Sequence, residues 1–215
     1  MKKIGILGSG DVAKNLAIGF ADQGYQVMLG TSHPKKLEGW LESNLSVKVG
    51  NFNESAEFGE LIVLAIKGSA SIEILQSIKN ELLHGKTILD TTNPIDNSEP
   101  INNVLAYFTK QNESLHEKLQ NHFPKSNFVK AFNSIGASLM YKPDFKENPT
   151  MFICGDNEKA KEFVIPIIEN FGFEVENFGK KESARPIESL CILWCIEGLK
   201  TNVWNGHGIK LLRKN

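Results

Sequence analysis

Short apolar runs alternate with segments of helical hydrophobic spacing through the first half of the chain. Residues 3–7 and 60–66 are nearly continuous apolar runs, which is typical of strands covered on both faces. Residues 12–21 instead repeat apolar side chains at helical spacing. By the same criteria we expect strands at 25–29, 46–49 and 87–89, a helix that starts at Pro34, and a helix over 71–83. This alternation predicts an α/β fold with a doubly wound, mostly parallel sheet.

The second half ends in an unusually apolar helix. Before it we expect helices at 114–123 and 158–170, and strands at 128–132, 150–154 and 174–178 that complete the sheet. Residues 183–199 carry apolar side chains on more than one helical face, so this helical tail should be buried inside the domain or between two subunits. We therefore expect a single domain over 1–215, in which 96–215 complete the sheet and form the interface of a homodimer.

Composition narrows the possible partners. The chain has 215 residues, 41% of them hydrophobic, and a formal net charge of -1, so it has no overall attraction to nucleic acid. The cysteines Cys154, Cys191 and Cys195 are too few for a disulfide framework or a four-cysteine zinc site, which favours a reducing compartment. The first apolar stretch is broken by glycines, and no window approaches the roughly 20 apolar residues of a membrane span. We expect a cytoplasmic protein without membrane or nucleic-acid partners.

A glycine-rich turn carries the strongest chemical signal. The sequence Gly8-Ser9-Gly10-Asp11-Val12-Ala13 has the pattern GxGxxA and lies between the first predicted strand and the first predicted helix. In this context Gly8 permits the tight turn and Gly10 lets backbone amides approach a diphosphate at the positive end of the helix. The fold is therefore expected to be of the Rossmann type, with residues 1–95 as its cofactor-binding half.

The end of the second predicted strand indicates which dinucleotide binds. An NAD site places an acidic residue there for the ribose hydroxyls, but this chain has Thr31, Ser32 and His33, followed by Lys35 and Lys36. No carboxylate would repel a phosphate, and lysines can hold one through charge-assisted hydrogen bonds. The pattern favours NADP over NAD. The alternative is that the two lysines form a solvated helix face.

Four segments resemble one known family across nearly the full chain. They are residues 4–12, residues 29–33, the strand end Asp90-Thr91-Thr92-Asn93-Pro94, and Val129-Lys130-Ala131-Phe132-Asn133. This combination resembles the coenzyme F420-dependent NADP oxidoreductases and their relatives, which include the oxidoreductase domain of the STEAP metalloreductases. The resemblance implies an NADP-dependent oxidoreductase that transfers hydride between NADP and a second redox cofactor or small acceptor.

The resemblance also implies the cofactor-binding residues. They are Gly8, Ser9, Gly10, Asp11 and Val12 for the diphosphate; Thr31, Ser32, His33 and Lys36 for the 2′-phosphate; and Ala65, Ile66, Lys67, Asn93, Pro94, Asn133, Ile135 and Ala137 for the nicotinamide and its ribose. Two positions depart from the family pattern: His33 stands where an Arg is common, and Lys67-Gly68 replaces an apolar Pro-Trp type pair. The acceptor therefore stays open among F420, a flavin, a ferric chelate and a small imine or carbonyl.

No catalytic residue is assigned, because direct hydride transfer needs positioning and exclusion of water more than an acid or base. A non-catalytic NADP-binding sensor is the alternative function.

Other reactive side chains are interpreted as structural. Cys191 and Cys195 are expected to be buried rather than metal ligands, and Asp90 is expected to cap the turn that follows it. The histidines His84, His116 and His122 are expected at the surface, and His207 in a plain turn rather than in a cleft.

Overall fold

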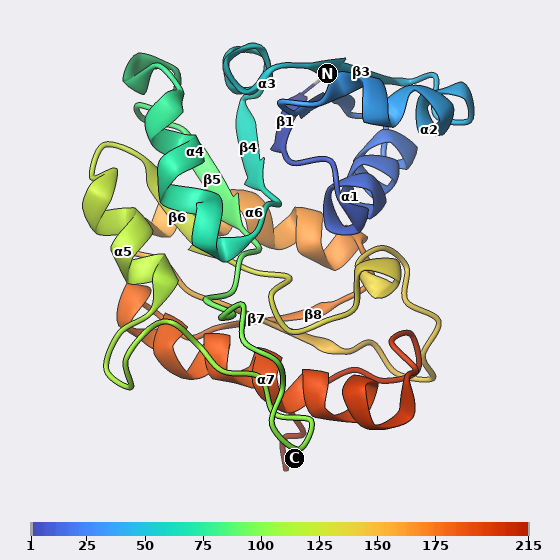
Figure 1. Cartoon of the computed structure of the whole chain (residues 1–215), viewed down its shortest axis with the longest axis vertical. Coiled ribbons are helices and arrows are strands. Elements are labelled where there is room, and N and C mark those ends of the chain that lie inside the picture. Colours follow the sequence, from blue (N-terminus) through green and yellow to red (C-terminus); the bar gives the residue numbers. More distant parts are fainter. Residues whose placement is uncertain (1, 215) are drawn as a thin grey trace.

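The computed structural model describes residues 2–214 and has a six-stranded parallel sheet at its centre (Figure 1). The strand order is β3-β2-β1-β4-β5-β6, which reverses direction between β1 and β4. Reversal points of this kind open a crevice at the carboxyl ends of the strands. The strands are β1 (Lys3–Leu7), β2 (Gln26–Gly30), β3 (Val47–Gly50), β4 (Leu61–Leu64), β5 (Thr87–Asp90) and β6 (Asn127–Lys130). The predicted Rossmann-type fold is confirmed.

Helices cover both faces of this sheet. Side chains alternate along β4, so that Leu61 and Val63 pack into one core cluster and Ile62 and Leu64 into another. The first cluster includes α1 (Asp11–Asp22) and α6 (Glu158–Asn170), and the second includes α3 (Phe52–Phe58), α4 (Ser71–Ser77) and α5 (Leu115–His122). The short helix α2 (Glu38–Glu42) follows a 3₁₀ turn at Pro34–Leu37, so the helix expected from Pro34 is split in two.

Two other helices differ from the expectation. The helix predicted over 71–83 ends at Ser77, because Ile78 adopts an extended backbone, and a 3₁₀ turn at Asn80–Leu82 follows. Helix α3 was not expected at all. Its start carries a capping box in which the Asn51 side chain accepts from Glu54 N and the Glu54 side chain accepts from Asn51 N.

The last two strands form a sheet of their own. β7 (Thr150–Ile153) and β8 (Glu174–Asn177) pair in parallel across α6, and a single antiparallel bridge, Lys130 to Cys154, joins them to β6. The expectation that they complete the main sheet is therefore wrong. The physical reason is that β7 has other partners on both edges: β8 on one side, and on the other the C-terminal segment, where Thr150 N donates to Ile209 O at 2.8 Å.

The long helix α7 (Ala184–Thr201) crosses below the main sheet and β7 (Figure 1). Its inner face packs against β7 and the loop that follows β5, whereas Leu193 on the outer face is 63% exposed. None of the helices in residues 2–214 combines the length and the apolar composition that a membrane span requires.

Candidate functional site

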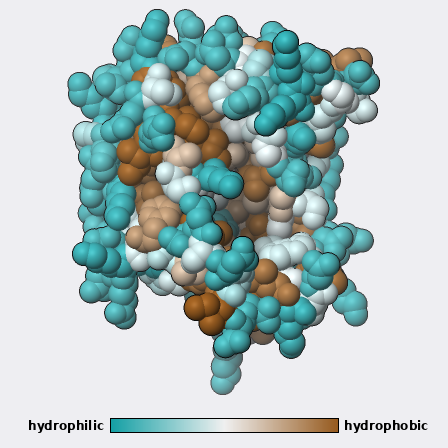
Figure 2. Space-filling view, in the orientation of Figure 1, coloured by the Kyte–Doolittle hydropathy of each residue, from teal (hydrophilic) through white to brown (hydrophobic). Residues whose placement is uncertain are grey.

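A cleft of about 1100 Å³ runs along the carboxyl ends of the central strands. Its walls are the glycine turn after β1, the end of β2, the loops after β4 and β5, and Ala137. Figure 2 shows the hollow on this side of the molecule, with apolar side chains in its walls and polar ones around it. The volume exceeds that of most drug-sized pockets, so an extended ligand fits better than a small metabolite alone.

The glycine turn leaves space for such a ligand. Gly8 has φ +139°, and a Cβ atom there would lie 2.1 Å from Ala65 O, so only glycine fits. At Gly10 a Cβ would meet no atom within 4 Å, because this glycine faces the open cleft. Gly10 is also the N-cap of α1 and provides no side-chain cap. The first amides of α1 are therefore available to an anion in the cleft.

Hydroxyl groups and a histidine form the end of the cleft beside β2. Ser9 Oγ lies 3.1 Å from Thr31 Oγ1, which accepts a hydrogen bond from His33 N at 3.1 Å. Ser32 Oγ and His33 Nδ1 are 2.8 Å apart, and both residues are exposed in the cleft. Lys36 lies one turn further on, outside the cleft lining, with its N–H bonded to His33 O at 3.1 Å. The arrangement offers polar groups and a nearby cation to a phosphate.

Two asparagines, which are hydrogen-bonded to each other, lie at the opposite end of the cleft. Asn93 Nδ2 donates to Asn133 O at 2.8 Å, and Asn133 Nδ2 donates to Asn93 Oδ1 at 3.2 Å and to Ile187 O at 2.9 Å. The chain enters this region through Phe132, a buried residue with φ +58°. A bulky residue in the left-handed region is strained, and such strain is retained where surrounding packing fixes the backbone. The wall is therefore held in one conformation.

Most of the predicted site residues meet in this cleft. Its lining includes Gly8, Ser9, Gly10, Asp11, Val12, Thr31, Ser32, His33, Ala65, Ile66, Lys67, Asn93 and Ala137. Four others are not in the lining: Lys36, Pro94, Asn133 and Ile135. Further residues line the cleft that were not predicted from the sequence: Phe52, Gly68, Ser69, Ala70, Ile74, Thr91, Thr92, Ile95, Asp96 and Asn97. Those that follow β4 and β5 could have been found from the rule that strand ends line the crevice, whereas Phe52 and Ile74 reach in from α3 and α4.

A buried cluster of charges lies behind the Asn93 wall. Lys130 Nζ is 2.8 Å from Asp90 Oδ2 and 2.9 Å from Glu188 Oε1, and it donates to Thr92 O at 2.7 Å. Burial by itself lowers the pKa of Lys130, but the carboxylates of Asp90 and Glu188 outweigh it and hold that pKa above its usual value. Burial raises the pKa of Asp90, but Lys130 and His116 outweigh it and keep that pKa well below its usual value. Both groups are therefore charged at neutral pH.

Two residues of this cluster, Asp90 and His116, were given positions from the sequence. Asp90 does cap its turn, since Asp90 Oδ1 accepts from Thr92 N at 3.0 Å and from Thr92 Oγ1 at 2.6 Å. The expectation that His116 lies at the surface is wrong. It is fully buried, its Nδ1 lies 2.9 Å from Asp90 Oδ2, and its ring meets Phe128 edge to face. The polar residues around it in α5 concealed this inward position.

The remaining candidates lie outside the cleft lining. Cys191 and Cys195 are buried as expected, with their sulfur atoms 3.8 Å apart, and residues 2–214 contain no group of three or more His, Cys, Asp or Glu side chains arranged to hold a metal ion. His207 stacks on Trp194 with ring centroids 4.7 Å apart, and its Nε2 lies 2.9 Å from Trp194 O. His207 thus holds the C-terminal segment against Trp194 of α7, and it does not line the cleft.

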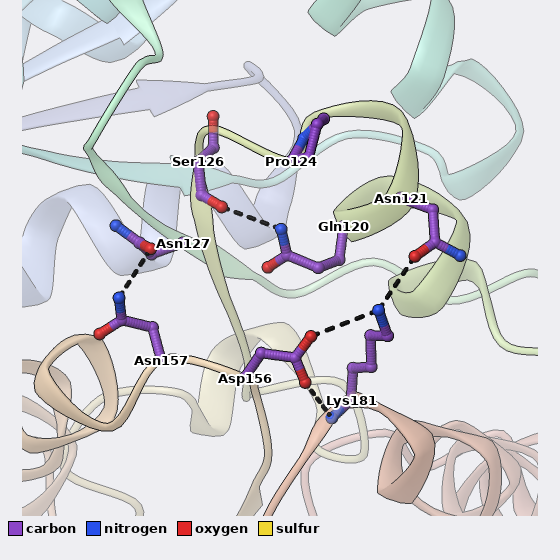
Figure 3. A pocket seen from close by; sticks show the side chains of 8 residues that line it. All are labelled: Gln120, Asn121, Pro124, Ser126, Asn127, Asp156, Asn157 and Lys181. Atoms are coloured by element: carbon purple, nitrogen blue, oxygen red, sulfur yellow. Dashed lines mark hydrogen bonds and ion pairs between the residues drawn. The ribbon is translucent and has the colours of Figure 1, made fainter.

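A second hollow of about 390 Å³ lies where α5 and β6 meet the start of α6. Figure 3 shows its polar side chains bonded to one another: Lys181 Nζ donates to Asn121 Oδ1 at 3.0 Å, and Asn157 Nδ2 donates to Asn127 Oδ1 at 2.8 Å. None of the predicted site residues lines it. The large cleft is therefore the candidate site.

Known proteins are similar to this chain over most of its length. The family model described as "NADP oxidoreductase coenzyme F420-dependent" matches residues 3–94, which contribute most of the residues that line the cleft. Metalloreductase STEAP3 of Rattus norvegicus is 30% identical over 87% of this chain, but the chain spans only 36% of that protein. The F420-dependent NADP reductase of Methanothermobacter thermautotrophicus is 25% identical over 98% of this chain and 94% of its own length.

A solved structure extends the likeness to the whole fold. A candidate F420-dependent NADP reductase from Arthrobacter sp. FB24 superposes with a TM-score of 0.90 and 30% identity, and the match covers 99% of this chain and 100% of the other. The family resemblance read from the four segments is thus confirmed over nearly every residue, and the chain belongs to the coenzyme F420-dependent NADP oxidoreductase family.

Proposed function

We propose that this protein binds NADP(H) in the large cleft and transfers hydride between NADP and a second redox cofactor or small acceptor. The observation that carries the proposal is the open glycine turn in a cleft whose lining has no carboxylate at the end of β2. The family to which the chain belongs is named for NADP, and the site offers groups for each part of that molecule.

The residues of the cleft fit the dinucleotide from end to end. The diphosphate would lie on the first amides of α1, where Gly10 leaves room for it. The 2′-phosphate would lie at Ser32 and His33, with Lys36 within one turn of them. The nicotinamide would then reach the wall formed by Asn93 and Ala137.

Hydride transfer depends on the positioning of the donor and the acceptor more than on an acid or base. Bound NADPH would supply the hydride, and the protein would hold donor and acceptor together and exclude water. The Asn93–Asn133 wall and the turn at Phe132 suit this role, because Asn133 Nδ2 donates to Ile187 O and Phe132 N donates to Met151 Sδ, and movement of either would break these buried hydrogen bonds.

For the acceptor, we propose F420 first, because the reductase of Methanothermobacter thermautotrophicus that matches nearly end to end is named for it. A flavin, a ferric chelate and a small imine or carbonyl follow. We also propose that the protein is a cytoplasmic homodimer that uses the outer face of α7.

The test is NADPH oxidation by the purified protein with F420, FMN, FAD, ferric citrate and a set of small carbonyls and imines, each in turn. We expect turnover with F420, and faster oxidation of NADPH than of NADH. Tight NADPH binding without turnover on any acceptor would instead support a non-catalytic sensor. Failure to bind NADPH would contradict the proposal as a whole.

A further inference from the structure

The Thr92–Asn93 segment of the cleft wall is fixed on almost every side. Asp90 binds the N–H and hydroxyl of Thr92, and Asn133 binds the Asn93 side chain. Gly68 packs so closely on Asn93 that a Cβ atom there would lie 1.9 Å from Asn93 O. The backbone of this segment therefore has little freedom to rotate.

A buried ammonium group holds the carbonyl between the two residues. Lys130 Nζ has three protons and three acceptors: Asp90 Oδ2, Glu188 Oε1 and Thr92 O. The Lys130 side chain is fully buried, so water does not compete for these bonds. Two acceptors neutralise the charge, and the third is a main-chain carbonyl of the cleft wall.

This contact sets the direction of the next amide. In a trans peptide the N–H points opposite to the C=O. The Thr92 carbonyl faces the buried Lys130, so the Asn93 N–H points away from it, toward the side on which Thr92 and Asn93 line the cleft. Among the hydrogen bonds of residues 2–214, none uses the Asn93 N–H as a donor. The ammonium also polarises the peptide and strengthens that N–H as a donor.

We propose that Lys130 is a positioning residue, which holds the Thr92–Asn93 peptide so that the Asn93 N–H donates to the carboxamide oxygen of the nicotinamide ring. This inference rests on the proposed NADP(H) function. A preformed donor at this point would fix the orientation of the ring, and with it the face of the nicotinamide that meets the acceptor.

The first test separates the two halves of the cofactor. 2′,5′-ADP carries the adenosine and the 2′-phosphate but no nicotinamide. Calorimetric titration of Lys130→Met should show NADPH affinity lowered about tenfold and 2′,5′-ADP affinity unchanged within twofold. Lys161→Met is the matched control. Lys161 is also a buried lysine, but it binds Glu158 and Gly179 O, away from the cleft, so neither affinity should change.

The second test uses the unmodified protein and therefore does not depend on how well a variant folds. Labelling threonine with ¹³C and asparagine with ¹⁵N selects only the amides of Asn93 and Asn202, which follow Thr92 and Thr201. The Asn93 amide signal should move with NADPH and stay in place with 2′,5′-ADP. Asn202, which lies outside the cleft lining, should not move with either ligand.

The outcomes distinguish the inference from the function on which it rests. An Asn93 signal that ignores bound NADPH, or equal losses of NADPH and 2′,5′-ADP in Lys130→Met, would overturn the role of Lys130 while NADP binding stands. If the unmodified protein binds neither ligand, the proposed function itself fails.

Discussion

The two glycines of the turn after β1 have different physical reasons to be glycine. Gly8 is required by its own backbone, whose φ is +139°, and by its contact with Ala65 O. Gly10 has an ordinary backbone, with φ -80°, and open space where a Cβ would stand. The fold therefore tolerates a side chain at position 10, whereas the diphosphate proposed for this position would not.

This difference makes Gly10→Ala a test of the site rather than of stability. We expect NADPH affinity to fall about tenfold or more, because the added methyl occupies the surface that the diphosphate would approach. The melting temperature should change by only a few degrees, since alanine at an N-cap costs at most about 1 kcal/mol more than glycine. Fluorescence titration and thermal unfolding measure the two effects.

Gly39→Ala is the matched control, because its Cβ also meets no atom within 4 Å and Gly39 lies in α2, outside the cleft. It should leave NADPH affinity unchanged. Equal affinities for Gly10→Ala and the unmodified protein would place the diphosphate elsewhere.

Lys36 was expected from the sequence to hold the 2′-phosphate, but it is not among the residues that line the cleft. Its backbone bond to His33 nevertheless keeps it one turn from the proposed phosphate site, within reach of a long side chain. We expect Lys36→Ala to weaken NADPH about tenfold, the value of one charge-assisted hydrogen bond, and to leave NADH nearly unchanged. Parallel titrations with both cofactors measure this, and equal losses would show that Lys36 does not read the 2′-phosphate.

At the scale of elements, the sequence was sufficient to predict the bounds of a helix or strand wherever the local pattern and the tertiary contacts favoured the same structure. The strands of the main sheet and α6 lie within one or two residues of the expected bounds, because continuous apolar runs and regular spacing leave few alternatives. Helix α4 is shorter than its spacing indicates, since Ile78 turns inward to the core instead of continuing the helix. The separate β7–β8 sheet could not be predicted, because it depends on which partner the edge of β7 finds.

Side chains from four elements meet in the buried cluster, so the stability that the cluster gives to their packing depends on pH. Asp90 ends β5, Lys130 ends β6, His116 belongs to α5, and Glu188 on α7 accepts from the first amides of α5. The folded-state pKa of Asp90 is lowered, so its contribution to stability is present above its unfolded pKa of about 4 and is lost as pH falls toward the folded value. The folded-state pKa of Lys130 is raised, so its contribution is present below about pH 10 and is lost as pH rises further.

Asp90→Asn should therefore destabilise the protein and change its response to acid. We expect a loss of about 3–5 kcal/mol in the free energy of unfolding at pH 7, because Lys130 keeps its charge and loses one of two buried counterions. Below about pH 4 the difference between variant and unmodified protein should shrink. Urea unfolding at pH 3, 5 and 7 measures both.

Asp22→Asn is a suitable control, because the Asp22 carboxylate pairs with Lys142 at the surface. Its effect should be far smaller at every pH. If Asp90→Asn were no more destabilising than this exposed substitution, the cluster would not be what joins α5 and α7 to the sheet.

At the scale of the whole molecule, the residues that line the cleft could be predicted from the sequence where strand ends alone define its wall. The glycine turn and the end of β2 carry their signals in adjacent residues, so they could be read directly. The wall around Asn93 could be placed only by resemblance, because its rigidity depends on Asn133, Lys130 and Glu188, which come from distant parts of the chain. His116 was misjudged for the same reason, since only tertiary structure brings Asp90 to it.

The outer face of α7 carries an apolar side chain, that of Leu193, which the described chain leaves exposed. Leu193 is 63% exposed on a helix whose inner face is buried. A twofold axis near Leu193 would cover this face with its own copy. Leu193→Glu would then place two carboxylates against each other in an apolar contact.

We therefore expect the unmodified protein to sediment as a dimer at micromolar concentration and Leu193→Glu to sediment as a monomer. Leu45→Glu is the matched control, because Leu45 is 89% exposed in the turn between α2 and β3 and lies outside the proposed interface. That variant should remain dimeric. Because the cleft is built within one chain, monomeric Leu193→Glu should keep its NADPH affinity. A dimer that survives Leu193→Glu would place the interface on another surface, and a monomeric unmodified protein would contradict the proposed dimer.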